Sequence, residues 1–289
     1  DVMHIEKNVC DNILWTILGV SGKSKDHVNA RRDLEEMGLR KQLHLQLAEG
    51  NKAYMPAAQY TMTTKEKETF LSILKMVKVP DGYSSNISKC VNLTSKTLQG
   101  LKSHDNHILL QQLIPIAICD CLSPNVVQPL IEMSNFFRQL CLRNQRMSDL
   151  KSLQDRIVLT LCHFEKLFPP SFFDVMVHLT VHLTDEVMAA GPVQFRWMYP
   201  IERYLSTLKR FVRNRARPEA SIANGYLMDE CTTFCAEYLT DVETKLDKPS
   251  RIHDGPVGEG TTFDMDNIEW IQAHRYILFN TPSVAPLMQ

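Results

Sequence analysis

Helix-forming segments separated by prolines dominate the chain from residue 92 to about residue 240, and this pattern constrains the fold most. In these segments apolar residues recur three and four positions apart, as they do on one face of a helix. Proline ends a helix or occupies its first turn, so the prolines mark boundaries. We therefore predict helices over residues 105–118, 123–143, 148–168, 171–188, 200–216 and 218–239.

The residues before position 92 give helix signals of other kinds. A helix with a narrow apolar stripe is predicted over residues 4–19, where apolar side chains from Ile5 to Ile17 are spaced by four. Three further predictions concern two short helices around Gly38 within residues 26–49, a helix from the Thr63–Glu66 capping box to just before Pro80, and a loop over residues 80–90.

The character of the chain changes after residue 245. Prolines and glycines between residues 249 and 260 predict a flexible linker, and residues 268–280 form a short apolar segment that suits a helix or a strand. The predicted fold is mainly α, a helical bundle-like domain with a flexible C-terminal tail and a boundary near residue 245.

Composition supports this fold class. Only 11 of the 289 residues are glycine, which favours helices over a turn-rich sandwich, and no apolar run is long enough to span a bilayer. The eight cysteines are spread along the chain without a signal-peptide pattern, so we expect reduced, buried thiols. The net charge of −1 gives no overall attraction to nucleic acid, so any such attraction must be local.

Two histidines four residues apart, His178 and His182, are one candidate metal site. On a helix both imidazoles would lie on one face and could hold one zinc ion. Two ligands do not complete a zinc site, and the cysteine pairs lack the two-residue spacing of a zinc knuckle. The alternative is a pair of histidines on a half-buried helix face.

Glu202 is the only acidic residue in a strongly basic stretch. Near the start of a predicted helix, its carboxylate suits the helix dipole, and among cations it also suits a metal that meets a phosphodiester. The stretch fits DNA phosphates or a solvated basic face, and its basic residues are Arg196, Arg203, Lys209, Arg210, Arg213, Arg215 and Arg217.

A third polar group, from Ser103 to His107, reads as structural. Asp105 suits the N-cap of the helix that follows, and the two histidines of this group suit a surface or a helix interface.

Several segments together resemble the C-terminal part of plant CACTA (En/Spm-type) transposases. DVMHIEKNVCDN (residues 1–12) resembles the end of the transposase core. Further segments resemble the plant domain of unknown function that follows that core. They are residues 102–112, 168–183, 197–217, 221–226 and 230–235, and they include WMYPIERY (residues 197–204). AHRYILFN (residues 273–280) resembles the segment after that domain. The implied domains are residues 1–20, 21–245 and 246–289.

The resemblance implies a ribonuclease H-like enzyme in which two aspartates and a glutamate hold two divalent metals. A helical insertion separates the second aspartate from the glutamate and carries a zinc site. In this sequence Asp1 and His4 match the family's Asp-x-x-His string, His178 and His182 match its later histidine pair, and Glu202 becomes the candidate third acid.

The first two catalytic aspartates and the Cys-x-x-Cys half of the zinc site have no counterpart here. We therefore expect a chain that is not an enzyme alone, with zinc and magnesium implied only for a longer protein and none bound tightly by this chain. DNA and the upstream transposase segment are the expected partners, a membrane is not, and the implied location is nuclear. The alternative is a domesticated or degenerate structural or protein-interaction module without catalysis.

Overall fold

The computed structural model describes residues 1–47, 53–79, 86–238 and 265–280. The chain divides into two compact units, residues 1–207 and residues 208–289, and each is described by itself. The predicted linker and the boundary near residue 245 lie outside the described residues.

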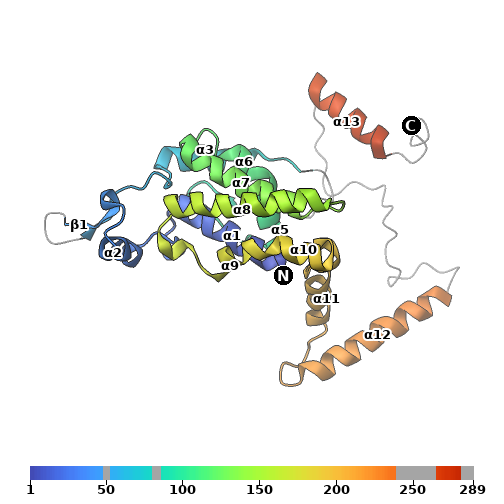
Figure 1. Cartoon of the computed structure of the whole chain (residues 1–289). Helices are drawn as coiled ribbons and strands as arrows, with labels where there is room; N and C mark the ends of the chain where they lie inside the picture. The colour runs from blue at the N-terminus through green and yellow to red at the C-terminus, as the bar shows by residue number, and fades with distance from the viewer. Residues whose placement is uncertain (48–52, 80–85, 239–264, 281–289) are drawn as a thin grey trace. The chain divides into compact units, whose positions relative to one another are not determined.

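The first unit is built almost entirely from helices (Figure 1). Its longer helices are α1 (Val2–Ile17), α2 (Val28–Glu36), α3 (Thr64–Met76), α7 (Pro124–Leu140), α8 (Met147–Leu167), α10 (Leu183–Ala190) and the first part of α11 (Tyr199–Arg210). Its shorter pieces are η1 (Lys41–Leu43), α4 (Ile87–Cys90), α5 (Ser103–Ile108), η2 (Leu109–Leu113), α6 (Ile114–Ala117), η3 (Pro170–Phe172), α9 (Val175–Leu179), η4 (Thr180–His182) and η5 (Val193–Phe195).

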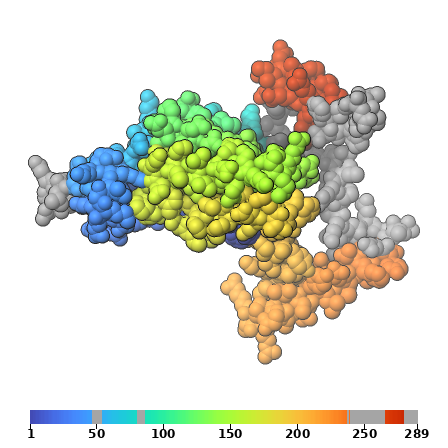
Figure 2. Space-filling model, in the orientation of Figure 1, coloured from blue at the N-terminus to red at the C-terminus, as the bar shows by residue number. Residues whose placement is uncertain are grey.

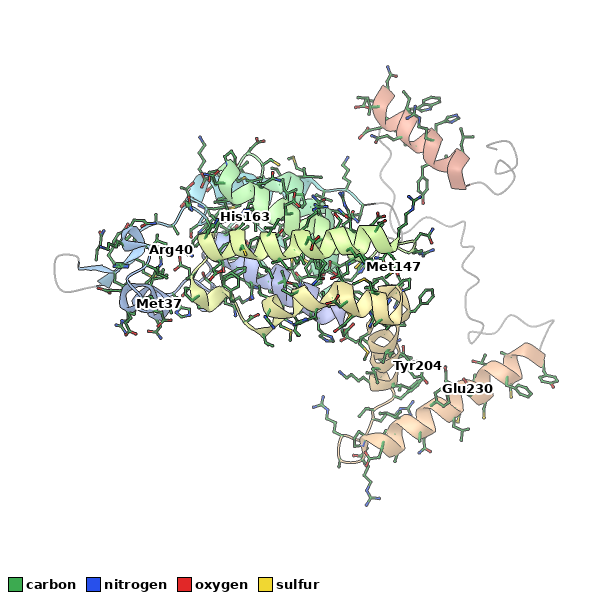
Figure 3. The ribbon with its side chains drawn as sticks, viewed as in Figure 1. Met37, Arg40, Met147, His163, Tyr204 and Glu230 are labelled. Atoms are coloured by element: carbon green, nitrogen blue, oxygen red, sulfur yellow. The ribbon has the colours of Figure 1, made fainter. Side chains whose placement is uncertain are left out.

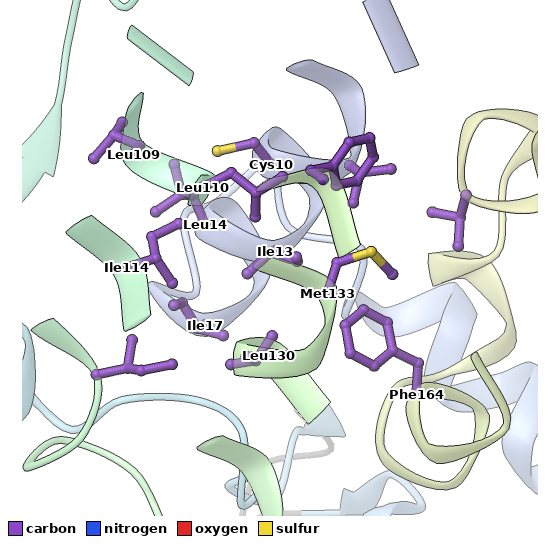
Figure 4. Close-up of a cluster of buried hydrophobic side chains, with 14 of the residues drawn as sticks. Cys10, Ile13, Leu14, Ile17, Leu109, Leu110, Ile114, Leu130, Met133 and Phe164 are labelled. Carbon is purple, nitrogen blue, oxygen red and sulfur yellow. The ribbon is translucent and has the colours of Figure 1, made fainter. Parts of the chain in front are cut away.

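Helix α1 is the centre of this unit. Its predicted apolar residues from Ile5 to Ile17 are all buried, and residues on its other faces, such as Cys10 and Leu14, are buried too. The apolar stripe in the sequence therefore underestimated how deeply α1 is buried, because a narrow stripe predicts a helix at the protein surface. Figure 4 shows Ile13 and Leu14 among side chains from η2, α7 and α8.

The helices around α1 exclude water from it. On the face shown in Figure 2, α7, α8 and α10 cover nearly all of the dark blue N-terminal helix. Phe164 of α8 and Met133 of α7 are fully buried against this core. Burial of such side chains contributes about 1.5–3 kcal/mol each and makes this packing the main source of stability.

Arg40 links the N-terminal segment to the end of α8. It takes a left-handed backbone conformation, with φ of 49°, and its guanidinium donates to the carbonyl oxygens of Leu167 at 3.0 Å and Phe168 at 2.7 Å, and also to that of Glu165. The last carbonyls of a helix have no partner within the helix, so Arg40 caps α8 (Figure 3).

Two short antiparallel hairpins complete the first unit. Strand β1 (Gln46–Leu47) pairs with β2 (Ala53–Tyr54), and β3 (Val91–Asn92) pairs with β4 (Thr97–Leu98). Neither was predicted, since two-residue strands carry no alternating pattern to detect.

In the second unit α12 (Pro218–Tyr238) begins at its proline, as predicted, and α13 (Asn267–Asn280) shows the last apolar segment to be helical. Gly225 of α12 lies against the ring of Phe211. A Cβ atom at Gly225 would stand 2.5 Å from the Cβ of Phe211, so only glycine permits this approach.

The mainly α fold is confirmed, and so is the capping box of Thr63 and Glu66. Three predictions of detail are wrong. The helix expected to run to residue 216 ends at Arg210, and residues 211–217 are turns and irregular backbone. The loop expected over residues 80–90 contains α4 in its described part. The cysteines are all free, but only Cys10 and Cys121 are fully buried, whereas Cys90 and Cys141 are half-buried and the other four are exposed.

Among the helices of the described residues, none is long and apolar enough to cross a membrane.

Candidate functional site

Three polar side chains from opposite ends of the first unit meet at the N-terminus of α1. Asp1 caps the helix, and its carboxylate lies 2.7 Å from Nδ1 of His4. The other ring nitrogen of His4, Nε2, lies 3.2 Å from a carboxylate oxygen of Glu202 on α11. The imidazole thus bridges two carboxylates that are 201 positions apart in the sequence.

This bridge is accessible to solvent. The side chains of His4 and Glu202 keep 47% and 43% of their surface exposed. An exposed pair of this kind adds little to stability. The contact between His4 and Glu202 therefore costs little free energy to open.

Aromatic contacts fix the beginning of α11 beside α5. The hydroxyl of Tyr199 donates to the carbonyl oxygen of Ser103 at 3.2 Å, and its ring packs edge-on against His104 and His107. Trp197 packs edge-on against both Tyr199 and His107. Burial, with nearby Glu6, raises the pKa of Tyr199. The hydrogen bond and ring contacts of Tyr199 fix the first turn of α11, which also carries Glu202.

A buried polar cluster lies on the inner side of these rings. Glu6 of α1 is almost fully buried and accepts from Nδ1 of His107 at 2.7 Å and from Nε2 of Gln111 at 2.7 Å. Cys141, which follows α7, completes the group, and burial beside Glu6 raises the pKa of its thiol to about 12. Burial, with nearby His107, lowers the pKa of His104.

The cluster depends on an irregular turn. Residues Leu109–Leu113 form a π-helical segment between α5 and α6, and Gln111 lies within it. Such segments are rare and occur often at functional sites. Here the Gln111 amide reaches Glu6, the ring of His107 and the carbonyl oxygen of Phe137.

The seven predicted DNA-binding residues fall into two groups. Arg196 and Arg203 belong to the first unit, where Arg196 lies 3.9 Å from Glu186. The second unit holds Lys209, Arg210, Arg213, Arg215 and Arg217, all exposed. The patch is therefore partly in the turn after α11 and not on one helix face.

A groove of about 430 Å³ lies within the second unit. Two of the predicted residues, Arg210 and Arg213, line it together with Ser221, Asn224 and Asp229. The two guanidiniums, with the hydroxyl of Ser221 and the amide of Asn224, provide donors that a phosphate oxygen can accept from, while the carboxylate of Asp229 reduces the positive charge of the groove.

His178 and His182 lie on neighbouring turns, with ring centroids 5.2 Å apart, and both are exposed. The predicted helix over residues 171–188 is divided into η3, α9, η4 and α10, yet the two rings stay on one side. Within the described part of the chain, no third ligand joins them in a metal-like group.

Asp105 has a different structural role from the one predicted. The helix begins at Ser103, so Asp105 lies in its first turn and accepts from the backbone amide of Lys102 at 2.8 Å. The prediction placed the helix start about two residues too late.

The sequence missed the buried cluster of Glu6, His107, Gln111 and Cys141. Its members are separated by up to 135 positions, so no spacing could reveal them. The available signal was the glutamate at position 6, a charged residue within a helix whose other residues are largely apolar.

Comparison with known proteins finds one family. Residues 140–253 match the model of a family described as a domain of unknown function, DUF4218. No curated protein matches the chain, and no solved structure matches it.

Proposed function

We propose that this chain is the C-terminal part of a CACTA-type transposase, a helical DNA-interaction region in which Glu202 serves as a metal-binding carboxylate of an active site completed elsewhere. Domains of the matched family are common in plant transposase-like proteins. The observation that carries the proposal is the bridge from Asp1 through His4 to Glu202. It joins the two segments whose motifs resemble the family's Asp-x-x-His string and third acid.

The chemistry of these residues fits the proposal. Carboxylate oxygens are the ligands that Mg²⁺ prefers, and Glu202 would hold the ion while the two remaining aspartates come from outside residues 1–289. The chemistry that a divalent ion would supply in such a site is activation of water or of a 3′ hydroxyl for attack on a phosphodiester. Nε2 of His4 lies beside the Glu202 carboxylate, and Tyr199 fixes the helix that carries Glu202.

DNA contact in this proposal comes from the turn after α11. Arg210, Arg213 and Arg215 are exposed, and the first two line the groove of the second unit. Each phosphate contact releases a counterion and steepens the dependence of affinity on salt by about 0.9 in the log–log slope.

Replacement of Arg210, Arg213 and Arg215 by alanine tests this contact. We expect weaker binding of a short labelled DNA duplex and a salt slope that is shallower by about 2–3, measured by fluorescence anisotropy across a salt series. The matched control replaces the exposed residues Arg32, Lys151 and Lys166 by alanine and removes the same charge.

The control should leave the slope nearly unchanged. Equal slopes for the wild type and the arginine variant would contradict DNA contact in this region. Equal flattening in both variants would show that only net charge matters, and this would also contradict it.

A second candidate, a protein-interaction module without catalysis, is favoured by the apolar side of α11. None of its residues is buried, and Ile201, Tyr204 and Leu205 keep about half of their surface exposed (Figure 3 shows Tyr204). Exposed apolar side chains that gather on one helix suit a protein partner. Ile201→Ser with Leu205→Ser separates the candidates, since it should leave the DNA salt slope intact and abolish only partner capture.

A further inference from the structure

The buried cluster behind Trp197 and Tyr199 combines three different metal-binding side chains. One ligand atom from each of Glu6, His107 and Cys141 lies within 4.8 Å of the other two. They come from α1, α5 and the end of α7, so the fold brings them together. Among the described residues, no other group of three or more such ligands has this geometry.

These three side chains form a set that zinc prefers. Thiolate, imidazole and carboxylate bind Zn²⁺ at about 2.0–2.3 Å, and three protein ligands leave a fourth position open. Tetrahedral bonds of that length separate the ligand atoms by roughly 3.3–3.8 Å. Ligand atoms within 4.8 Å of one another reach this geometry through small side-chain rotations.

Burial of the Glu6 carboxylate favours binding of a cation in this cluster. The side chains of Glu6 and His107 keep only 2% and 15% of their surface exposed. A buried carboxylate is costly unless it is compensated, and in this structure His107 and Gln111 are the side chains that hydrogen-bond to it. A divalent cation bound by one carboxylate and one thiolate leaves no net charge in the interior.

Surrounding groups hold the three ligands in place. Gln111 fixes one oxygen of Glu6 from the π-helical segment, and Gln194 donates to the carbonyl oxygen of Cys141. The edges of Trp197 and Tyr199 confine the ring of His107. Metal ligands in proteins are oriented by such second contacts, and the Gln111 contact comes from the π-helical segment.

We propose that Glu6, His107 and Cys141 bind a zinc ion. Binding replaces the hydrogen bond between His107 and Glu6 with two bonds to the metal, and the thiol proton of Cys141 is released to solvent. The site differs from the pair His178 and His182, and it departs from the expectation that this chain binds no metal tightly. It does not rest on the proposed transposase function, so either can fail alone.

Cobalt titration of the whole chain tests the site, because Co²⁺ occupies zinc sites and is coloured when thiolate binds it. We expect a near-ultraviolet thiolate-to-cobalt band that zinc displaces. The band should disappear in Cys141→Ser and fall at least about tenfold in apparent affinity in His107→Gln. Cys162→Ser, which removes an exposed thiol, and the double variant His178→Ala with His182→Ala should keep it.

Far-ultraviolet circular dichroism of each metal-free variant shows whether it is folded. The results for Cys141→Ser and His107→Gln are interpreted separately, so that either folded variant tests the site. A band that persists in either folded ligand variant overturns the proposal, as does its absence in the wild type. A band that the His178 and His182 variant loses also overturns it. Loss confined to the ligand variants, with zinc raising the melting temperature of the wild type alone, supports it.

Discussion

At the scale of single residues, Asp26 and Arg31 form a buried ion pair in the first unit. The side chains keep 6% and 1% of their surface exposed, and the guanidinium donates to both carboxylate oxygens, at 2.5 and 2.6 Å. Tyr60 donates to the same carboxylate at 2.9 Å, and burial raises the pKa of that phenol. Asp26 therefore holds a buried cation and a buried hydroxyl at once.

Asp26→Ala should lower the free energy of unfolding by about 3–5 kcal/mol, because it leaves the buried guanidinium of Arg31 without its partner charge. Urea unfolding measures the change. Glu68→Ala, which breaks the exposed pair with Lys96, should cost no more than about 1 kcal/mol. Similar losses in both variants would contradict the role assigned to burial.

The carboxylate of Asp174 makes the stability of the fold depend on pH in the acidic range. Burial opposes ionisation of its carboxylate, but hydrogen bonds from Asn12, Lys25 and the backbone of α9 outweigh burial and lower its pKa. A lowered folded-state pKa adds stability above the ordinary carboxyl pKa of about 3.9 and loses it as pH falls further.

Asp174→Ala should therefore cost about 1–2 kcal/mol at pH 7 through the lost cap of α9. The difference between variant and wild type should shrink as pH falls from about 4 toward 2, measured by urea unfolding at each pH. A difference that stays constant over this range would contradict the assignment.

At the scale of elements, sequence periodicity located most helices. It failed where contacts between distant segments determine how deeply a helix is buried or where it ends. Pro124 and Pro218 each begin a helix as predicted, because proline suits the first helical turn. Local spacing gave no sign that α1 is enclosed by other helices. The π-helical segment and the early end of α11 were missed as well, since neither interrupts the apolar pattern.

Gly225→Ala is a test of the packing in the second unit. Alanine in a helix usually stabilises it by up to about 1 kcal/mol relative to glycine. Here its Cβ would overlap the side chain of Phe211, so we expect destabilisation instead. Hydrogen exchange of α12 amides measures this effect, and protection should fall.

The double variant Gly225→Ala with Phe211→Ala should recover protection relative to Phe211→Ala alone. Increased protection in the single Gly225→Ala variant would mean that the ring of Phe211 does not lie against α12.

At the scale of the whole molecule, the sequence indicated the helical class and some of the residues that meet. Asp1, His4 and Glu202 were chosen from motifs, and the structure places them in contact, although contact alone does not test their role. Glu6, His107 and Cys141 could not be chosen together, because only the packing of α1 against α5 and α7 unites them. The two histidines His178 and His182 are neighbours without a third ligand in the described residues.

Strand transfer by the protein extended upstream of Asp1 tests the central claim most directly. Glu202→Gln keeps the size of the side chain and removes its charge, and Glu36→Gln, at an exposed position of α2, is the matched control. Loss of a residue that only supports the metal ligands typically lowers activity by roughly 10–100-fold. We predict that Glu202→Gln lowers strand transfer by more than this and leaves DNA affinity near that of the wild type. The control variant should keep both strand transfer and DNA affinity near those of the wild type. Strand transfer retained in Glu202→Gln would contradict the claim and remove this carboxylate from the active site.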